Sequence, residues 1–200
     1  MKARKILVSL AALALVAAIS IGGTIAYLTS TDKVENSFTV GKVAITLDES
    51  KVDINGTTVT PAARVKSNTY KLMPGHSYTK DPTVHVDAGS ENSWLFVKVE
   101  NGLENFESDN AGYTKIAKQI TDNGWAALTG VTGVYYKSYT SQDAALDVPV
   151  FGNFKIADGA QDTEGWADAK DAKITINAYA VQADGFDTAL AAWNATFGKA

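Results

Sequence analysis

Trp94-Leu95-Phe96-Val97-Lys98-Val99-Glu100 is the strongest β-strand pattern in the sequence, and it decides the fold class. Leu95, Val97 and Val99 are two residues apart, so they share one face of an extended chain. Aromatic and β-branched residues, which are enriched in strands, make up most of this stretch. We therefore expect a strand here that places these three side chains in a hydrophobic core.

Further strand patterns lie on both sides of this segment and are separated by turn residues. Over 38–47 the apolar positions change parity, and a bulge or bend at Gly41 would bring both halves onto one buried face. Asn55-Gly56 is a tight-turn dipeptide that can close a hairpin, and Pro74-Gly75 is a second turn signal. The other expected strands are 69–73, 78–86, 131–139, 148–156 and 174–182.

Two segments have the apolar spacing of helices. Over 113–120 the apolar residues recur at helical intervals, and Gly124 ends that pattern. A second helix is expected over 186–197, with Asp184 or Asp187 as its N-terminal cap. Strands joined by Gly-, Asn- and Asp-rich turns predict an antiparallel β-sandwich of the jelly-roll kind, with one or two short peripheral helices.

The first 26 residues have the pattern of a secretory signal peptide. Basic residues within 2–5 precede an apolar run over 6–21, and small residues follow as far as Ala26. This order of a basic, an apolar and a small-residue part is typical of exported proteins. We expect a signal peptidase to cut between Ala26 and Tyr27, which makes the mature chain a secreted or cell-surface protein.

A retained membrane anchor is the alternative for this N-terminus. The apolar run has 16 residues, fewer than the roughly 20 that a membrane-spanning helix needs. Gly22-Gly23 would also weaken a helix that continued beyond the run. Cleavage is therefore the favoured interpretation.

The composition of the mature chain restricts its function. Without the three basic residues of the signal, 15 Lys and Arg stand against 22 Asp and Glu, which gives a net charge of −7. This acidic balance argues against nucleic acid and anionic lipid as partners. The chain has no cysteine, which excludes a thiol nucleophile and a thiolate metal site.

Several stretches, taken in order, carry a resemblance to a known family. They are 22–29 with its Gly-Gly-Thr-Ile-Ala start, 36–43 with Asn-Ser-Phe-Thr-Val-Gly-Lys-Val, Met73-Pro74-Gly75, 94–99, and 176–186 with Ile-Asn-Ala-Tyr-Ala-Val-Gln. In this order and spacing they resemble the camelysin/TasA family. The resemblance spans nearly the whole chain.

The resemblance implies a function as well as a fold. It implies a secreted jelly-roll subunit of biofilm-matrix or cell-surface fibres in a Gram-positive-type bacterium, processed by a SipW-type signal peptidase. The N-terminal segment of one subunit then completes the sheet of the next, so the partner is a further copy, with other matrix proteins as additional partners.

The chain accordingly divides into a signal (1–26), an N-terminal arm (27–37) and a jelly-roll domain (38–200). The alternative for the arm is a terminus that is disordered in the isolated monomer. The residues expected to act in polymerisation are Tyr27, Leu28, Thr29, Ser30, Thr31 and Asp32.

Proteins of the camelysin type have been described as metalloproteases, but the sequence has no zinc-protease motif. Its two histidines, His76 and His85, are nine residues apart and do not form the HExxH pattern. We expect His76 to form hydrogen bonds in a turn and His85 to face solvent from a strand. An acidic run could bind calcium through carboxylate oxygens, but it lacks the EF-hand pattern and suggests a solvated loop. Its members are Asp158, Asp162, Glu164, Asp168 and Asp171.

No catalytic residue, cofactor or metal ligand is therefore assigned. The preferred function is a structural subunit that polymerises by donor-strand exchange. The alternatives are a monomeric cell-surface adhesin or binding module, which would use loops at one end of the same fold, and a surface metalloprotease.

Overall fold

The computed structural model describes residues 41–110 and 112–198, and in this part the protein is mainly β, with antiparallel sheets and a few short helices. The expected signal peptide, its cleavage between Ala26 and Tyr27, and the arm over 27–37 lie outside the described residues. So does the first part of the strand expected over 38–47.

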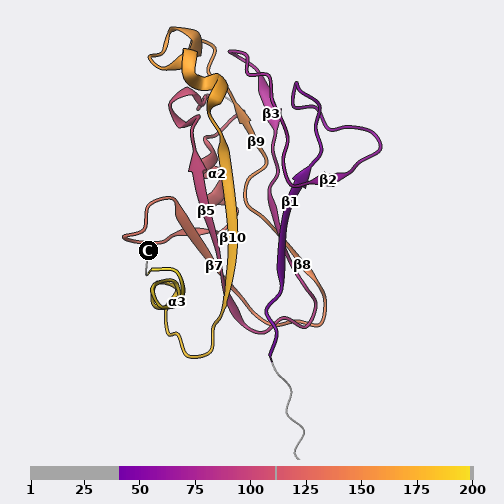
Figure 1. The fold of residues 1–200 in the computed structure, drawn as a ribbon, viewed down its shortest axis with the longest axis vertical. Coiled ribbons are helices and arrows are strands. Elements are labelled where there is room, and N and C mark those ends of the chain that lie inside the picture. Colours follow the sequence, from indigo (N-terminus) through magenta and orange to yellow (C-terminus); the bar gives the residue numbers. More distant parts are fainter. Residues whose placement is uncertain (1–40, 111, 199–200) are drawn as a thin grey trace, which may run out of the picture. The chain divides into compact units, whose positions relative to one another are not determined.

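Two four-stranded sheets form the body of the fold (Figure 1). The first has the order β2-β1-β4-β8 and contains β1 (Ile45–Ser50), β2 (Arg64–Val65), β4 (Thr83–Val86) and β8 (Leu146–Pro149). The second has the order β10-β5-β7-β6 and contains β5 (Ser93–Asn101), β6 (Ala126–Ala127), β7 (Val134–Tyr139) and β10 (Ile174–Gln182). A separate two-stranded sheet pairs β3 (Ser77–Thr79) with β9 (Asn153–Lys155).

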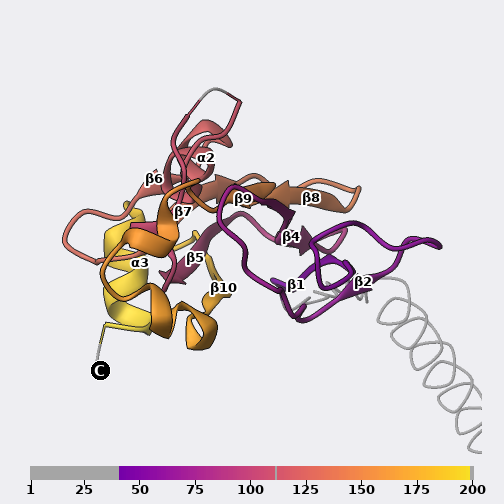
Figure 2. The same cartoon turned by 90° about the horizontal axis from the view of Figure 1, so that it is seen from above.

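The helical segments are short. They are α2 (Ile116–Asp122), α3 (Ala189–Thr196) and the 3₁₀ segments η1 (Glu104–Phe106), η2 (Ala160–Asp162) and η3 (Trp166–Asp171). Figures 1 and 2 both show α3 on the side of β5 and β10 that faces away from β1. No helix in residues 41–110 and 112–198 has the length and apolar character needed to cross a membrane.

β5 confirms the strand that was expected from its alternating pattern, and both of its faces are buried. Leu95 and Val97 are at most 1% exposed and belong to the main hydrophobic cluster. Phe96 points to the opposite face and is fully buried in a second cluster, where its ring lies 5.2 Å from that of Trp193 of α3. Each such side chain contributes about 1.5–3 kcal/mol when it leaves water, so β5 is the centre of the fold.

Two of the expected strands, 78–86 and 148–156, are each broken into two. The chain passes from β3 to β4 and from β8 to β9, so both segments leave one sheet and enter another. The breaks lie side by side, because Lys80 N donates to Gly152 O and Val150 N donates to Pro82 O. Pro82 has no N–H with which to continue a ladder, which explains the position of the first break.

The strand expected over 69–73 is wrong. Within residues 41–110 and 112–198 this segment has no ladder partner, and Tyr78 hydrogen-bonds to part of its backbone instead. The Tyr78 hydroxyl accepts a hydrogen bond from Met73 N (2.7 Å) and donates one to Lys71 O (2.8 Å). The strand expected over 131–139 begins only at Val134, because Gly133 has a φ of +72° in the preceding turn.

The turn at Asn55-Gly56 is confirmed. Gly56 has a φ of +81°, and the Asp53 carboxylate accepts hydrogen bonds from the backbone N–H groups of Asn55 and Thr57, each at 2.9 Å. A Cβ at Gly56 would lie 2.7 Å from the Tyr78 ring, so a larger residue would displace that ring. The hairpin itself is minimal, with one bridge between Val52 and Thr58.

Both expected helices are present, but the cap expected for the second is wrong. Thr188, and neither Asp184 nor Asp187, caps α3: its hydroxyl accepts a hydrogen bond from Ala191 N at 3.1 Å. Thr188 has the extended backbone of an N-cap residue, with φ −140° and ψ 151°, and therefore occupies the last position before the helix.

We expect Thr188→Ala to lower the free energy of unfolding by about 1 kcal/mol, because α3 loses its only side-chain N-cap bond. Asp187→Ala is the matched control and should change stability by less than about 0.5 kcal/mol. Urea unfolding followed by tryptophan fluorescence measures both. An equal effect of the two substitutions would refute the assignment of the cap.

Candidate functional site

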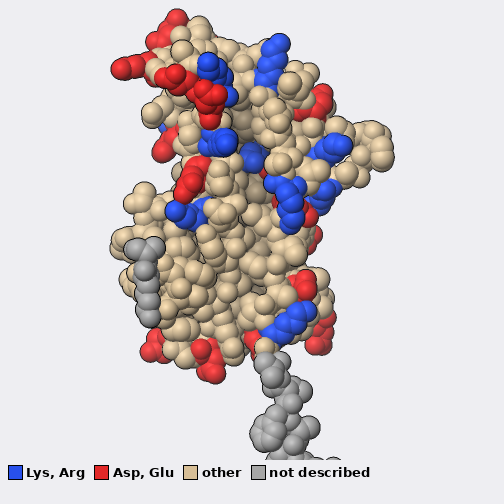
Figure 3. Space-filling model, viewed as in Figure 1, with Lys and Arg blue, Asp and Glu red and all other residues tan. Residues whose placement is uncertain are grey.

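A cleft of about 1030 Å³ opens between β1 and the first residues of β10. Residues 47–49 of β1 and the segment 66–72 form one side, and residues 166–176, which include η3 and the start of β10, form the other. Figure 3 shows this face of the molecule, with basic side chains gathered around its hollowed middle. The cleft thus separates the two large sheets at one of their margins.

β10 is an edge strand, since β5 is its only strand partner in the described part of the chain. Lys173 O accepts from Gly102 N, and Ala183 N donates to Asn92 O, so the odd-numbered residues of β10 make the ladder bonds to β5. Ile174 and Ile176 therefore direct their backbone N–H and C=O groups away from β5. The same two side chains pack against the main hydrophobic cluster and line the cleft.

β1 presents a similar edge on the other side of the cleft. Asp87 N donates to Ala44 O, which places Ile45 and Leu47 in pairs that do not hydrogen-bond to β4. β2 pairs only with Glu49 and Ser50, so it does not cover these two residues. One of the free acceptors has a side-chain partner, because Lys66 Nζ donates to Leu47 O at 2.5 Å.

Apolar side chains along the cleft are only partly buried. They pack on the main cluster but have no covering layer in residues 41–110 and 112–198. These residues are Leu47, Tyr70, Leu72, Trp166, Ala172, Ile174 and Ile176. The cleft therefore combines free backbone groups with apolar surface, which is what an added β-strand requires.

Positive charge predominates along the cleft, although the chain as a whole is acidic. Among the described residues, five lysines line it against two acidic residues, Asp48 and Glu49. The lysines are Lys66, Lys71, Lys80, Lys170 and Lys173. This arrangement favours an occupant that carries negative charge.

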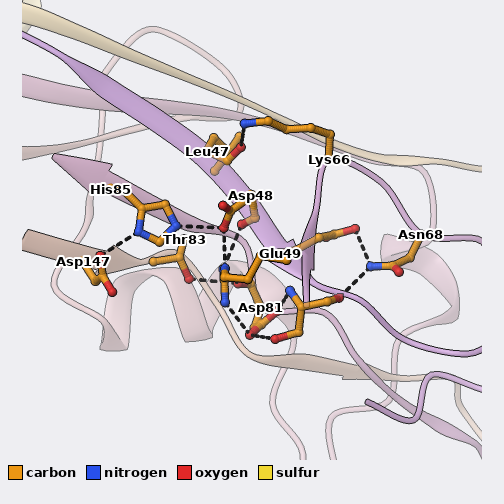
Figure 4. Close-up of polar contacts among 11 residues, drawn as sticks. Leu47, Asp48, Glu49, Lys66, Asn68, Asp81, Thr83, His85 and Asp147 are labelled. Atoms are coloured by element: carbon orange, nitrogen blue, oxygen red, sulfur yellow. Dashed lines mark hydrogen bonds and ion pairs between the residues drawn. The ribbon is translucent and has the colours of Figure 1, made fainter. Parts of the chain in front are cut away.

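A buried ion pair lies in the lining of the cleft. Lys80 Nζ is 2.5 Å from Glu49 Oε2, and the side chains of Lys80 and Glu49 are 9% and 6% exposed. Asn68 Nδ2 donates to the other carboxylate oxygen, Glu49 Oε1, at 2.9 Å, and to Ser50 O at 2.8 Å. Figure 4 shows the contact between Asn68 and Glu49.

A second polar network covers the outer face of the first sheet (Figure 4). His85 of β4 bridges two neighbouring strands: its Nε2 lies 2.8 Å from Asp48 Oδ1 of β1 and its Nδ1 lies 2.6 Å from Asp147 Oδ1 of β8. Arg64 of β2 also contacts Asp48, and it contacts Asp81 at 3.4 Å. The network ties β1, which forms one side of the cleft, to its neighbours.

These contacts shift the proton affinities of the network. Hydrogen bonds to Asp48 and then to Asp147 raise the pKa of His85. Desolvation acts to raise the pKa of Asp48, but hydrogen bonds from His85 and Arg64 outweigh it, so that this pKa lies below its usual value. The network is therefore strongest when His85 is protonated and Asp48 is ionised.

The structure does not bring the two histidines together. His76 is exposed in a turn, where its N–H donates to Met73 O, as its position after Pro74-Gly75 suggested. His85 does point away from the side of β4 that carries the buried Val84 and Val86, but its two carboxylate partners were not expected from the sequence. Asp48 and Asp147 are too far from it along the chain to form a recognisable pattern.

The residues of the acidic run lie on the solvent-exposed surface. Its five residues, Asp158, Asp162, Glu164, Asp168 and Asp171, are all exposed around η2 and η3. In residues 41–110 and 112–198, no three His, Asp or Glu side chains come together as a metal ion would need. The expected arm residues 27–32 lie outside the described part.

The sequence predicted β10 as a strand, but its pattern does not distinguish an edge strand from a central one. Ile174 and Ile176, which line the cleft, alternate with Thr175 and Asn177 as they would in either position. Comparison with protein-family models, with curated proteins and with solved structures finds no match to this chain. The geometry of the cleft is therefore the basis for the function proposed below.

We expect the pH dependence of stability to come in part from His85. Because its pKa is raised in the folded state, its contribution is complete below the unfolded value of about 6.5 and is lost as pH rises through the folded pKa. His85→Gln should therefore reduce the fall in unfolding free energy that the wild type shows from about pH 6 to pH 9.

Urea unfolding at a series of pH values measures this effect. His76→Gln is the control, because His76 is exposed and is not part of the network; it should keep the wild-type pH profile. If His85→Gln and the wild type lose stability in parallel, His85 does not contribute in the way the contacts indicate.

Proposed function

We propose that the chain is a secreted structural subunit of extracellular or biofilm-matrix fibres, and that its copies join by strand addition in the cleft. The free edge of β10 beside an uncovered apolar cleft carries this proposal. An added strand would bond to the backbone of Ile174 and Ile176, while its alternate side chains would enter the cleft. No catalytic residue, cofactor or metal is part of the proposal.

A jelly-roll sandwich is the fold that we propose for the subunit. Two antiparallel four-stranded sheets support it, as do the passages of the chain from β4 in one sheet to β5 in the other and from β7 back to β8. The hydrophobic cluster between them takes side chains from β1, β4 and β8 of one sheet and from β5 and β10 of the other. The added strand would complete this sandwich at its open margin.

The N-terminal arm of another copy is the proposed occupant. Residues 27–37 precede the described domain and follow the expected cleavage point. At ~3.3 Å per residue the ten residues from 27 to 36 span about 30 Å, which is enough to cross a sheet. Tyr27 and Leu28 supply apolar anchors, and Asp32 and Glu35 outnumber Lys33, so the arm carries a net negative charge that suits the lysines of the cleft.

This contact is heterologous, because the arm of one copy meets the cleft of the next. Each added copy then offers a new free arm or cleft, so the contact propagates into a fibre when the rotation between successive copies does not close a ring. Removal of the signal by a SipW-type peptidase would free the arm, and further matrix proteins with the same kind of arm could enter the fibre.

Deletion of Tyr27 to Asp32 should leave a folded, soluble monomer that does not extend fibres, because the donor strand and its apolar anchors are gone. Electron microscopy and light scattering of the mature protein follow the assembly, and circular dichroism confirms the fold. If the truncated protein polymerises at the wild-type rate, the arm is not the donor.

The acceptor edge can be tested separately with Ile176→Pro. Ile176 N–H points away from β5, so proline there removes a donor from the free edge without removing a ladder bond. Ile176→Ala is the matched control, since it loses the same apolar side chain but keeps the N–H. We expect fibre elongation at least about tenfold slower for Ile176→Pro than for Ile176→Ala. Equal rates would show that this edge is not used.

A monomeric surface module is the second candidate, and the five lysines of the cleft favour it. In that case the cleft would bind an anionic partner and the protein would remain monomeric after cleavage of its signal. Size-exclusion chromatography of the mature wild type at low and physiological salt distinguishes the two, because only a fibre subunit forms long assemblies.

A further inference from the structure

Lys80, Glu49 and Asn68 form a set of buried polar side chains that strand addition does not use. Glu49 lies at the centre, with the Lys80 amine on Oε2 at 2.5 Å and the Asn68 carboxamide on Oε1 at 2.9 Å. An amine and a carboxamide are thus held by the two oxygens of one carboxylate. They come from separate segments, Glu49 from β1, Asn68 from the chain after β2, and Lys80 from the chain after β3.

The surroundings of these side chains exclude most water. Lys80 and Glu49 keep 9% and 6% of their side-chain surface exposed. Tyr70 lines the same cleft and packs edge-on against Phe154, with ring centres 5.6 Å apart. Burial, and then the negative charge of Glu49, raise the pKa of Tyr70.

We propose that Lys80 and Asn68 become joined by an intramolecular amide bond, with Glu49 as the group that moves the proton. This inference does not depend on polymerisation, because all three residues belong to one chain. A buried lysine paired with a carboxylate is also found as a purely structural ion pair. The arrangement here differs because a carboxamide, which is an acyl donor, shares the carboxylate with the amine.

The proposed reaction is a transamidation that needs no further reactant. Glu49 takes a proton from Lys80 Nζ, which leaves a lone pair on the amine for attack on Asn68 Cγ. A bond forms between Nζ and Cγ, and the carbonyl π electrons move to Oδ1. Glu49 delivers the proton to Nδ2, the Cγ–Nδ2 bond breaks and NH3 leaves, and Glu49 takes the second proton of the amine and ends as a neutral carboxyl group. The products are one secondary amide and one ammonia molecule.

The fold supplies the two conditions that this reaction requires. Because the amine and the carboxamide are held on one carboxylate of the same chain, the reaction avoids the entropic cost of a bimolecular encounter. Asn68 is itself fixed, because its Oδ1 accepts from Val52 N at 3.0 Å and its Nδ2 also donates to Ser50 O. Val52 N–H bound to Oδ1 would stabilise the negative charge that develops there.

The bond would close the segment from Asn68 to Lys80, which forms one side of the cleft. This segment has no strand over 69–73 and no disulfide can hold it, because the chain has no cysteine. A covalent cross-link restricts the unfolded chain and so stabilises the folded one. It would also replace a buried pair of charges by a neutral amide and a single carboxyl group.

The test is the intact mass of the folded, exported wild-type protein, followed by peptide mapping. We expect a mass lower than that of the sequence by one ammonia molecule, and a branched peptide that joins Lys80 to Asn68. Glu49→Gln should abolish the cross-link, because an amide cannot take the proton. Lys80→Arg is the charge-matched control, since it keeps the positive charge but removes the nucleophilic amine.

The mass of the wild-type protein tests for the cross-link even if a variant fails to fold. A full, unmodified mass of the folded wild type overturns the proposal. Loss of ammonia that maps to Asn55-Gly56 or Asn101-Gly102, where a succinimide has the same mass change, overturns it as well. A cross-link in Lys80→Arg would equally exclude Lys80 as the amine.

Discussion

β5 lies in the middle of its sheet with apolar side chains on both faces, and the rest of the fold depends on the cover that these faces need. One face requires the first sheet, which supplies β1, β4 and β8 across the main cluster. The other requires α3, whose Trp193 packs on Phe96. β5 pairs with β10 along one margin and with β7 along the other, so its backbone groups have ladder partners on both sides. β10 has no further strand partner in the described residues and forms an edge of this sheet.

The position of β10 creates the candidate site. Its inward side chains are only partly covered, and its outward backbone groups have no strand partner within residues 41–110 and 112–198. Soluble proteins usually protect such an edge with charges, bulges or a covering segment. Here lysines surround the cleft and Lys66 occupies one free carbonyl of β1, but the apolar surface between the two edges remains open. A strand from another copy would bury that apolar surface and would also hydrogen-bond to the free backbone N–H and C=O groups.

The polar side chains around β1 have two different roles. On the outer face, His85, Asp48 and Arg64 connect strands while they remain partly in contact with water, so they respond to pH. On the inner face, Glu49 and Lys80 are removed from water, where an unpaired charge would cost several kcal/mol. β1 thus carries a pH-dependent polar network on its outer side and a buried ion pair on its inner side.

The sequence by itself determined the strands in which apolar residues alternate along the chain, and the turns in which glycine is required. Strand 174–182, the strand around Leu95, Val97 and Val99, and the glycine turns at Asn55-Gly56 and Pro74-Gly75 follow from alternation and backbone preference, which act over a few residues. Only the tertiary structure decided that 78–86 and 148–156 change sheets, that Tyr78 replaces a partner strand for 69–73, and that Thr188 caps α3. It alone brought Asp48 to His85 and Glu49 to Asn68 and Lys80. These three contacts join residues 19 to 37 positions apart, and their strength depends on burial and geometry that no local pattern contains.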